Sequence, residues 1–292
     1  MNRSLAALGL DDVAAERPLV YPGRPATQPS LLAQDELLPL DVRPARLGAW
    51  RAEQGGTLDD ILVAHGQTPV GRRHPVIAVG SNASPGQVRH KLLRLGLPVF
   101  VPMVPVRVEG IGVGCSGHIS PAGYVAATPV VAPGTTTTLV VTWLDGRQLK
   151  AVDDTEFPDY RRAILPGEEF AMTMPSGERL GGAYIYFSAH GTLAPVDGRP
   201  LPGGGDQATI LSGLLGRSPR LHELLGPDPE AWVERAGGDT GTRARGTTLF
   251  GEEGWVLPPD DFVPYLDESD TLRRYDDLPP LPGSLPSGSG TG

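Results

Sequence analysis

The sequence has little of what stabilises a secreted protein or anchors a protein in a membrane. Its single cysteine, Cys115, excludes an intramolecular disulfide and a cysteine-based zinc site and fits a reducing compartment. Met1 to Val20 lacks the apolar core of a signal peptide, and no run of about 18 apolar residues occurs. We therefore expect a cytoplasmic protein with no membrane partner.

Positive charge and the best-known catalytic motifs are also scarce. The formal net charge is -9, and the one basic cluster, Arg89 to Arg94, is more typical of a solvated helix face than of a nucleic-acid site. We expect no nucleic-acid partner. There is no G-x-S-x-G elbow, Walker loop or H-E-x-x-H motif, and the six histidines are scattered, so we expect no metal and no cofactor. A G-x-G-x-x-G match at Gly112 to Gly117 opens no helix and is weak as a dinucleotide fingerprint.

Glycine (39 residues) and proline (31) are abundant in the 292 residues, which indicates one compact body with loose flanks. We predict a Pro- and Ala-rich extension in residues 1–70, with a short helix over Leu58 to His65 that Thr57 caps, and a central domain in 71–190. A helical extension packed on that domain should follow in 191–258, and then an acidic tail, disordered at its end, in 259–292. Several short strands with few helices between them favour an α+β fold, a small mixed β-barrel with added helices.

The strongest local signal lies in Pro75 to Leu95. An apolar run predicts a buried strand that turns sharply at Gly80. Ser84 then suits the N-cap of a helix, and Gln87 suits the reciprocal side chain of a capping box. A strand, a tight polar loop and a helix start present free N–H groups to an anion or a carbonyl oxygen.

The following segments predict strands of a sheet. Leu97 to Val108 alternates, but its three prolines restrict it to an edge or bulged strand. Gly110 to Gly117 is expected to be a glycine-rich crossing. Tyr124 to Val131 and Thr137 to Trp143 predict two strands joined by a turn. A further pair of strands is expected in residues 160–174.

A predicted helix from Leu144 to Asp154 leads to the candidate acid, Glu156. Carboxylates at that end oppose the helix dipole, which is a reason to suspect function, although a solvated acidic turn explains them about as well. Phe157 and Tyr160 nearby would give Glu156 an apolar surround suited to proton exchange near neutral pH. His118 could line the same site, but a lone histidine on a glycine-rich loop is more often a hydrogen-bonding loop residue.

Two separated motifs resemble those of the gamma-glutamylcyclotransferase family. Val79-Gly80-Ser81-Asn82 resembles the YGSN-type loop between a strand and a helix, with valine in place of the usual tyrosine. The segment that runs from Trp143-Leu144-Asp145 through Glu156 to Tyr160-Arg161-Arg162 resembles the one that carries the catalytic glutamate of that family, with Phe157 where a glycine often follows the acid. The resemblance covers about Pro75 to Ala189.

The resemblance implies a reaction that needs no protein nucleophile, metal or cofactor. In this reaction the free α-amine of a γ-glutamyl group attacks its own γ-carbonyl, which releases an amine or amino acid and leaves 5-oxoproline. Glu156 is then the general acid and base. Backbone groups of Gly80, Ser81 and Asn82 would bind the substrate, and we add His118 and Tyr160 as substrate-binding residues.

Two other hypotheses stay open. One is a non-catalytic binding or scaffold module on the same fold, which Val79 favours. The other is a different amide-cleaving or acyl-transfer enzyme that uses the same carboxylate. A pocket in which Glu156 lies beside the Gly80 to Asn82 backbone would favour an enzyme, whereas a filled pocket or an outward Glu156 would favour the scaffold.

Overall fold

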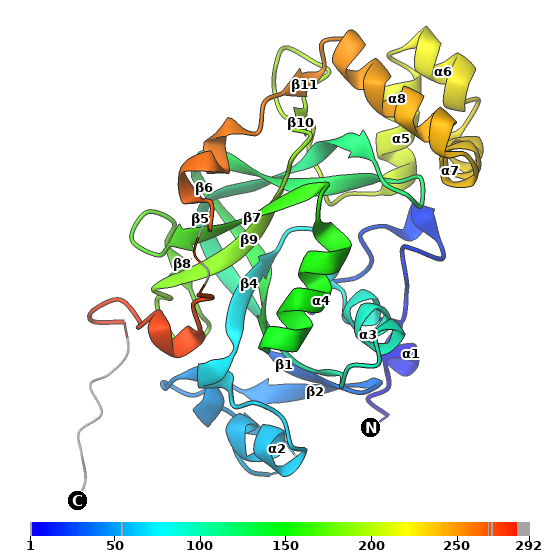
Figure 1. The fold of residues 1–292 in the computed structure, drawn as a ribbon. Helices are drawn as coiled ribbons and strands as arrows, with labels where there is room; N and C mark the ends of the chain where they lie inside the picture. The colour runs from blue at the N-terminus through cyan, green and yellow to red at the C-terminus, as the bar shows by residue number, and fades with distance from the viewer. Residues whose placement is uncertain (1, 54, 268, 270, 285–292) are drawn as a thin grey trace, which may run out of the picture.

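The computed structural model describes residues 2–53, 55–267, 269 and 271–284. Within them, a mixed sheet follows the order β3-β2-β1-β5-β6-β4-β9-β7, with the short strands β8, β10 and β11 paired off this path (Figure 1). The strands are β1 Ser30–Ala33, β2 Glu36–Asp41, β3 Arg51–Ala52, β4 His74–Ala78, β5 Phe100–Ile119, β6 Val125–Leu144, β7 Tyr160–Pro166, β8 Met172–Thr173, β9 Gly182–Ser188, β10 Thr192–Leu193 and β11 Val256–Leu257.

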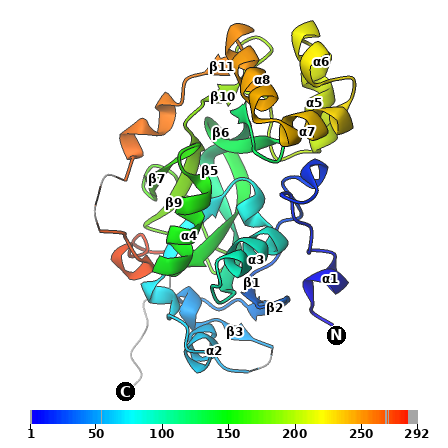
Figure 2. The same ribbon diagram turned by 45° about the vertical axis from the view of Figure 1, so that its right-hand side comes forward.

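Helices lie over one face of the sheet and at both of its ends. Helices α3 and α4 lie side by side over the face, α2 lies at one end, and α5 to α8 form a cluster at the other (Figure 2). The helices are α1 Leu5–Leu8, α2 Leu58–Ala64, α3 Pro85–Arg94, α4 Gly146–Glu156, α5 Gln207–Leu215, α6 Pro219–Leu225, α7 Pro229–Gly238 and α8 Thr240–Glu252.

The predicted α+β class with a mixed sheet is confirmed. Strand β4 runs parallel to β9 and antiparallel to β6. Closure into a barrel is absent from the described part of the chain, because the path ends at β3 and β7 without a pairing between them. The outer side of β7 is taken by the segment near the C-terminus, through a bridge between Ala163 and Leu266.

Strands β5 and β6 form the long central hairpin, so of the two predicted alternatives the edge strand is wrong, and the ladder shifts register just beyond Val108, between Glu109 and Ile111. Strand β5 pairs with β1 on one side and with β6 on the other. Its prolines are tolerated because each lies beyond the end of one ladder. Pairing with β6 starts at Met103, after Pro102, and pairing with β1 stops there, before Pro105. At each proline one side of β5 is therefore outside a partner ladder, which is where a residue without an N–H fits.

The predicted glycine-rich crossing is part of β5, and the two strands predicted in residues 124–143 are one strand, β6. The ladder between them shifts register near Gly110 and again near the hairpin end. The glycines allow close approach of other backbone segments. A Cβ atom on Gly117 would overlap the carbonyl oxygen of His190, and a Cβ atom on Gly203 would overlap the carbonyl of Gly114.

Other local predictions have mixed outcomes. Helix α2 begins after Thr57, which forms a capping box with Asp60. The strands expected to pair in residues 160–174 do not pair, because β7 pairs with β9 and β8 pairs with β5. Helix α8 lies within the predicted helical extension but has no helical signal of its own in the sequence, because only Gly246, Leu249 and Phe250 of it are buried and no apolar period results. No helix of the described residues is long and apolar enough to cross a bilayer. The end of the predicted disordered tail, residues 285–292, lies outside them.

Candidate active site

The turn after β4 is a short 3₁₀ helix, Ser81–Ala83. Its backbone leaves donors unused: none of the hydrogen bonds in the described part of the chain involves the N–H groups of Gly80, Ser81 or Asn82. All three residues line a cavity. The loop therefore offers main-chain donors to a ligand, as such turns do for carboxylates and other anions.

The start of α3 differs from the predicted capping box. Ser84 occupies the N-cap, but its buried hydroxyl has no hydrogen-bond partner among the described residues. The side-chain oxygen of Gln87 accepts from the backbone N–H of Ala14 (3.1 Å) instead of turning back to the cap. The N-terminal segment packs over this helix start so closely that a Cβ atom on Gly86 would lie 2.6 Å from the carbonyl oxygen of Leu10. A long-range contact has displaced the local one.

Tyr21, from this N-terminal segment, forms one wall of the cavity. Its hydroxyl accepts a hydrogen bond from the backbone N–H of Ala127 (2.7 Å), and its ring stacks on Tyr124 with 4.2 Å between centroids. A Cβ atom on Gly80 would overlap this hydroxyl. The glycine of the loop is thus required by a side chain nearly 60 residues away, for which the sequence motif gives no signal.

Glu156, the last residue of α4, points at the loop. Its Oε1 accepts from Lys91 Nζ (2.8 Å) and from Asn82 Nδ2 (3.0 Å). Lys91 Nζ also donates to Asn82 Oδ1 (2.8 Å), so the three side chains form a closed triangle. Only 13% of the Lys91 side chain and 14% of the Glu156 side chain are exposed. Oε2 of Glu156 has no hydrogen-bond partner in the described part of the chain.

Two expectations about this part of the site do not hold. In the cluster from Arg89 to Arg94, which was expected to be a solvated helix face, Arg94 is exposed but Lys91 is mostly buried. The position of Lys91, three residues after buried Val88 on the same face of α3, is the signal that could have shown this. The surround of Glu156 is polar, because an amide and an ammonium contact it while Phe157 is 46% exposed. The opposing helix dipole is offset by these partners.

Tyrosines line much of the remaining wall. The hydroxyl of Tyr160 donates to the carbonyl oxygen of Ala127 (2.8 Å), and that of Tyr186 donates to Asp153 (2.6 Å). Burial raises the pKa of Tyr124 to about 12, and burial holds the pKa of Tyr160 well above its usual value. These phenols are neutral at pH 7 and act only through hydrogen bonds and shape.

His118 lies on the wall next to Tyr160, with 5.7 Å between ring centroids. Its ring also lies 4.6 Å from that of His190, whose Nε2 contacts Asp159 (2.8 Å). Burial, with the neighbouring His190 as a second cause, lowers the pKa of His118 to about 4. The imidazole is therefore neutral at pH 7.

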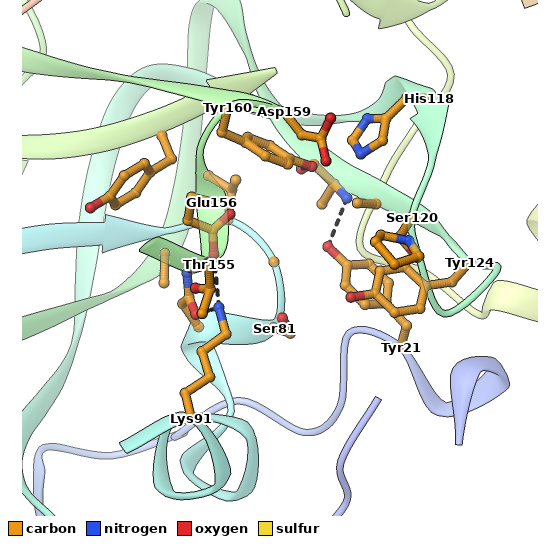
Figure 3. A pocket seen from close by; sticks show the side chains of 18 of the residues that line it. Tyr21, Ser81, Lys91, His118, Ser120, Tyr124, Thr155, Glu156, Asp159 and Tyr160 are labelled. Carbon is orange, nitrogen blue, oxygen red and sulfur yellow. Dashed lines mark hydrogen bonds and ion pairs between the residues drawn. The ribbon is translucent and has the colours of Figure 1, made fainter. Parts of the chain in front are cut away.

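These groups enclose a cavity of about 140 Å³. This is below the ~300–1,000 Å³ of sites for drug-sized ligands, and it suits a ligand the size of one amino acid. Figure 3 shows Glu156 and Lys91 on one side and His118 and Tyr124 on the other. No cluster of metal-ligating side chains occurs in the described residues. The residues that sequence reasoning predicted all line the cavity: Gly80, Ser81, Asn82, His118, Glu156 and Tyr160. Lining residues that it missed include Tyr21, Lys91, Tyr124, Asp159 and Tyr186.

No family model and no curated protein sequence matches the chain. Solved structures do match. An uncharacterized protein from Homo sapiens is 14% identical over 68% of this chain and 95% of its own, with a TM-score of 0.33. A gamma-glutamyl cyclotransferase is 13% identical over 67% of this chain and 94% of its own (TM-score 0.32). A gamma-glutamyl cyclotransferase specific to glutathione from yeast is 12% identical over 56% and 97% (TM-score 0.29). Scores this low establish no shared family, so the function must be argued from the site.

Proposed function

We propose that the protein cyclises a γ-glutamyl compound, releasing an amine or amino acid and forming 5-oxoproline. One observation carries the proposal. The carboxylate of Glu156 accepts a hydrogen bond from Asn82, and the loop of Asn82 has three backbone donors that no described residue uses; both line one small cavity. An acid–base group beside an anion-binding loop is what an intramolecular attack by an amine requires.

The residues support each step of the reaction. The α-carboxylate of the substrate would accept hydrogen bonds from the N–H groups of Gly80, Ser81 and Asn82, which folds the neutral α-amine toward the γ-carbonyl. As the amine nitrogen bonds to the carbonyl carbon, Glu156 takes its proton. When the tetrahedral intermediate collapses, the old C–N bond breaks and Glu156 returns that proton to the leaving nitrogen.

The two oxygens of Glu156 have different roles because its hydrogen-bond partners contact only one of them. Lys91 and Asn82 both donate to Oε1 and so fix the direction of the carboxylate. Oε2, without a partner in the described residues, is the oxygen that would carry the proton. The inward carboxylate and the open cavity support this enzyme over the scaffold hypothesis.

The experiment is an assay of 5-oxoproline released from a panel of γ-glutamyl amines and dipeptides. Glu156→Gln should lower turnover by about 10²–10⁴-fold, the usual contribution of a positioned acid–base group. The matched control is Asp154→Asn, in the same helical turn, whose carboxylate faces solvent and pairs with Lys150. Full activity of Glu156→Gln would remove it as the base, and a wild type inactive on the whole panel would refute the reaction.

A further inference from the structure

A short chain of hydrogen bonds links the backbone of His190 through two serine hydroxyls to the ring of His118 in the cavity wall. The backbone N–H of His190 donates to Ser188 Oγ (3.0 Å), which lies 2.7 Å from Ser116 Oγ. Ser116 Oγ lies 2.5 Å from Nδ1 of His118. The side chains of both serines and of His118 are buried, with residue exposures of 5% or less. Solvent therefore has little part in deciding where their hydrogens lie.

The direction of this chain follows from counting hydrogens. Ser188 already accepts from a backbone N–H, and its own hydroxyl hydrogen can reach Ser116 Oγ. Ser116 then donates its hydrogen to Nδ1 of His118. In the reverse direction Ser116 would donate to Ser188, whose hydrogen would have no acceptor among the hydrogen bonds of the described residues. If Ser116 instead accepted from both Ser188 and His118, its own hydrogen would have no acceptor among those bonds. Leaving a buried hydroxyl hydrogen without an acceptor is unfavourable, which favours the first direction.

This direction fixes the tautomer of His118. A neutral imidazole that accepts at Nδ1 carries its proton on Nε2. Nε2 makes no hydrogen bond to the described residues, and His118 lines the cavity. With its pKa lowered to about 4 by burial, the ring does not add a second proton at neutral pH. His118 thus presents an uncharged N–H donor to a ligand.

We propose that Nε2–H of His118 donates a hydrogen bond to the γ-carbonyl oxygen of the substrate as negative charge develops there, and that Ser116 and Ser188 are the positioning residues that hold this tautomer. This role rests on the cyclotransferase function proposed above. Attack of the amine moves the carbonyl π electrons onto oxygen. Collapse of the intermediate restores the double bond and expels the leaving nitrogen. No proton passes to or from His118.

The two faces of the cavity then have different tasks. Glu156 moves protons between nitrogens on one side, and His118 stabilises oxygen on the other (Figure 3). A neutral donor suits a cavity that also contains the Glu156 carboxylate. A positively charged imidazolium would attract this carboxylate and disturb its role in proton transfer. Loss of one oxyanion donor typically lowers kcat by about 10²–10³-fold.

The first test reads the tautomer directly, without turnover. Long-range ¹H–¹⁵N spectra of the ¹⁵N-labelled wild-type protein at pH 7 should show His118 protonated at Nε2 only. Ser116→Ala should give a mixture of tautomers, and Ser116→Thr, which keeps the hydroxyl, should restore the single form. Addition of 5-oxoproline, whose lactam oxygen mimics the acceptor, should shift the Nε2 resonance. An Nδ1–H tautomer in the wild type would overturn the inference whatever the activity.

The second test is kinetic and separates this inference from the reaction itself. With a γ-glutamyl anilide as probe, His118→Phe should lower kcat by about 10²-fold or more with little change in KM. Ser116→Ala should lower kcat less, and Ser116→Thr should recover it. Wild-type turnover with unchanged kcat in a folded His118→Phe variant would refute the role of His118 and leave the cyclotransferase proposal standing. A wild type inactive on every γ-glutamyl compound would refute both.

Discussion

The contact between Gly80 and Tyr21 can be tested sharply, because removing the hydroxyl oxygen of Tyr21 should make room for a Cβ atom on residue 80. Gly80 has φ −129°, outside the left-handed region, so a positive φ is not what demands glycine here. The Tyr21 hydroxyl does, because it occupies the place of a Cβ atom. We therefore expect Gly80→Ala to be costly alone and cheap when Tyr21→Phe is also present.

The sizes of these effects follow from the contacts. Tyr21→Phe removes the acceptor of the buried Ala127 N–H and should cost about 1–3 kcal/mol. Gly80→Ala forces a methyl group into the hydroxyl and should cost about 1–3 kcal/mol by overpacking. Without the hydroxyl, the nearest atoms to that methyl group are the Ala127 Cβ and the Tyr21 ring carbon, both at 3.5 Å, which is ordinary contact. The double variant should then be about as stable as Tyr21→Phe.

The assay is a double-mutant cycle in urea, followed by the fluorescence of the four tryptophans. The coupling between the two sites should be favourable by about 1–3 kcal/mol, with an unchanged m-value. Costs that add to within about 0.5 kcal/mol would refute the steric argument, since independent sites add in that way. A double variant that regains the stability of Tyr21→Phe but does not bind 5-oxoproline would show that the methyl group also blocks the loop donors.

Three further perturbations test the site. The pKa of His118 is lowered from about 6.5 to about 4, so as the pH falls the unfolded chain binds this proton before the folded chain does. Between pH 7 and pH 5 the free energy of unfolding of the wild type, measured in urea, should therefore fall by about 2 kcal/mol more than that of His118→Gln. Equal losses in the two proteins would contradict the burial argument. Lys91→Met should destabilise by about 1–3 kcal/mol, because it strips the partly buried Glu156 of its cation, and the loss should shrink when Glu156→Gln is also present. Gly117→Ala should cost about 1–3 kcal/mol by pushing away the His190 carbonyl, and should shift the His118 ring resonances; unchanged spectra would contradict the contact.

Sequence reasoning predicted the features that are local in the chain. The strand before Gly80, the cap at Thr57 and the helix that ends at Glu156 each follow from residues within a few positions of one another. The α+β class follows from the density of strand signals. The meeting of Glu156 with the Gly80 loop is not local. It was predicted only because two motifs matched one family pattern.

What could not be predicted depends on contacts between distant segments. Nothing around Tyr21 indicates that its hydroxyl would contact the loop at Gly80, because the N-terminal segment shows no sustained period and its docking depends on surfaces built from distant segments. The capping box at Ser84 failed for the same reason, since Ala14 engages Gln87. The prolines of β5 predicted an edge, yet two staggered ladders accommodate them.

Lys91 shows how far the site is built into one stretch of chain. Side chains of an α-helix tilt toward its N-terminus, so a lysine two turns into α3 returns its ammonium toward the loop from which the helix starts. There the ammonium donates one hydrogen bond to Asn82 and a second one to the carboxylate of Glu156. Residues 80–91 therefore supply both the backbone donors and the cation of the site, and α4 supplies Glu156. It follows that a carboxylate placed here by another helix would be oriented in the same way. A lysine moved by one position along α3 would instead leave the face that Val88 and Leu92 bury, and Glu156 would lose the ammonium that orients its carboxylate.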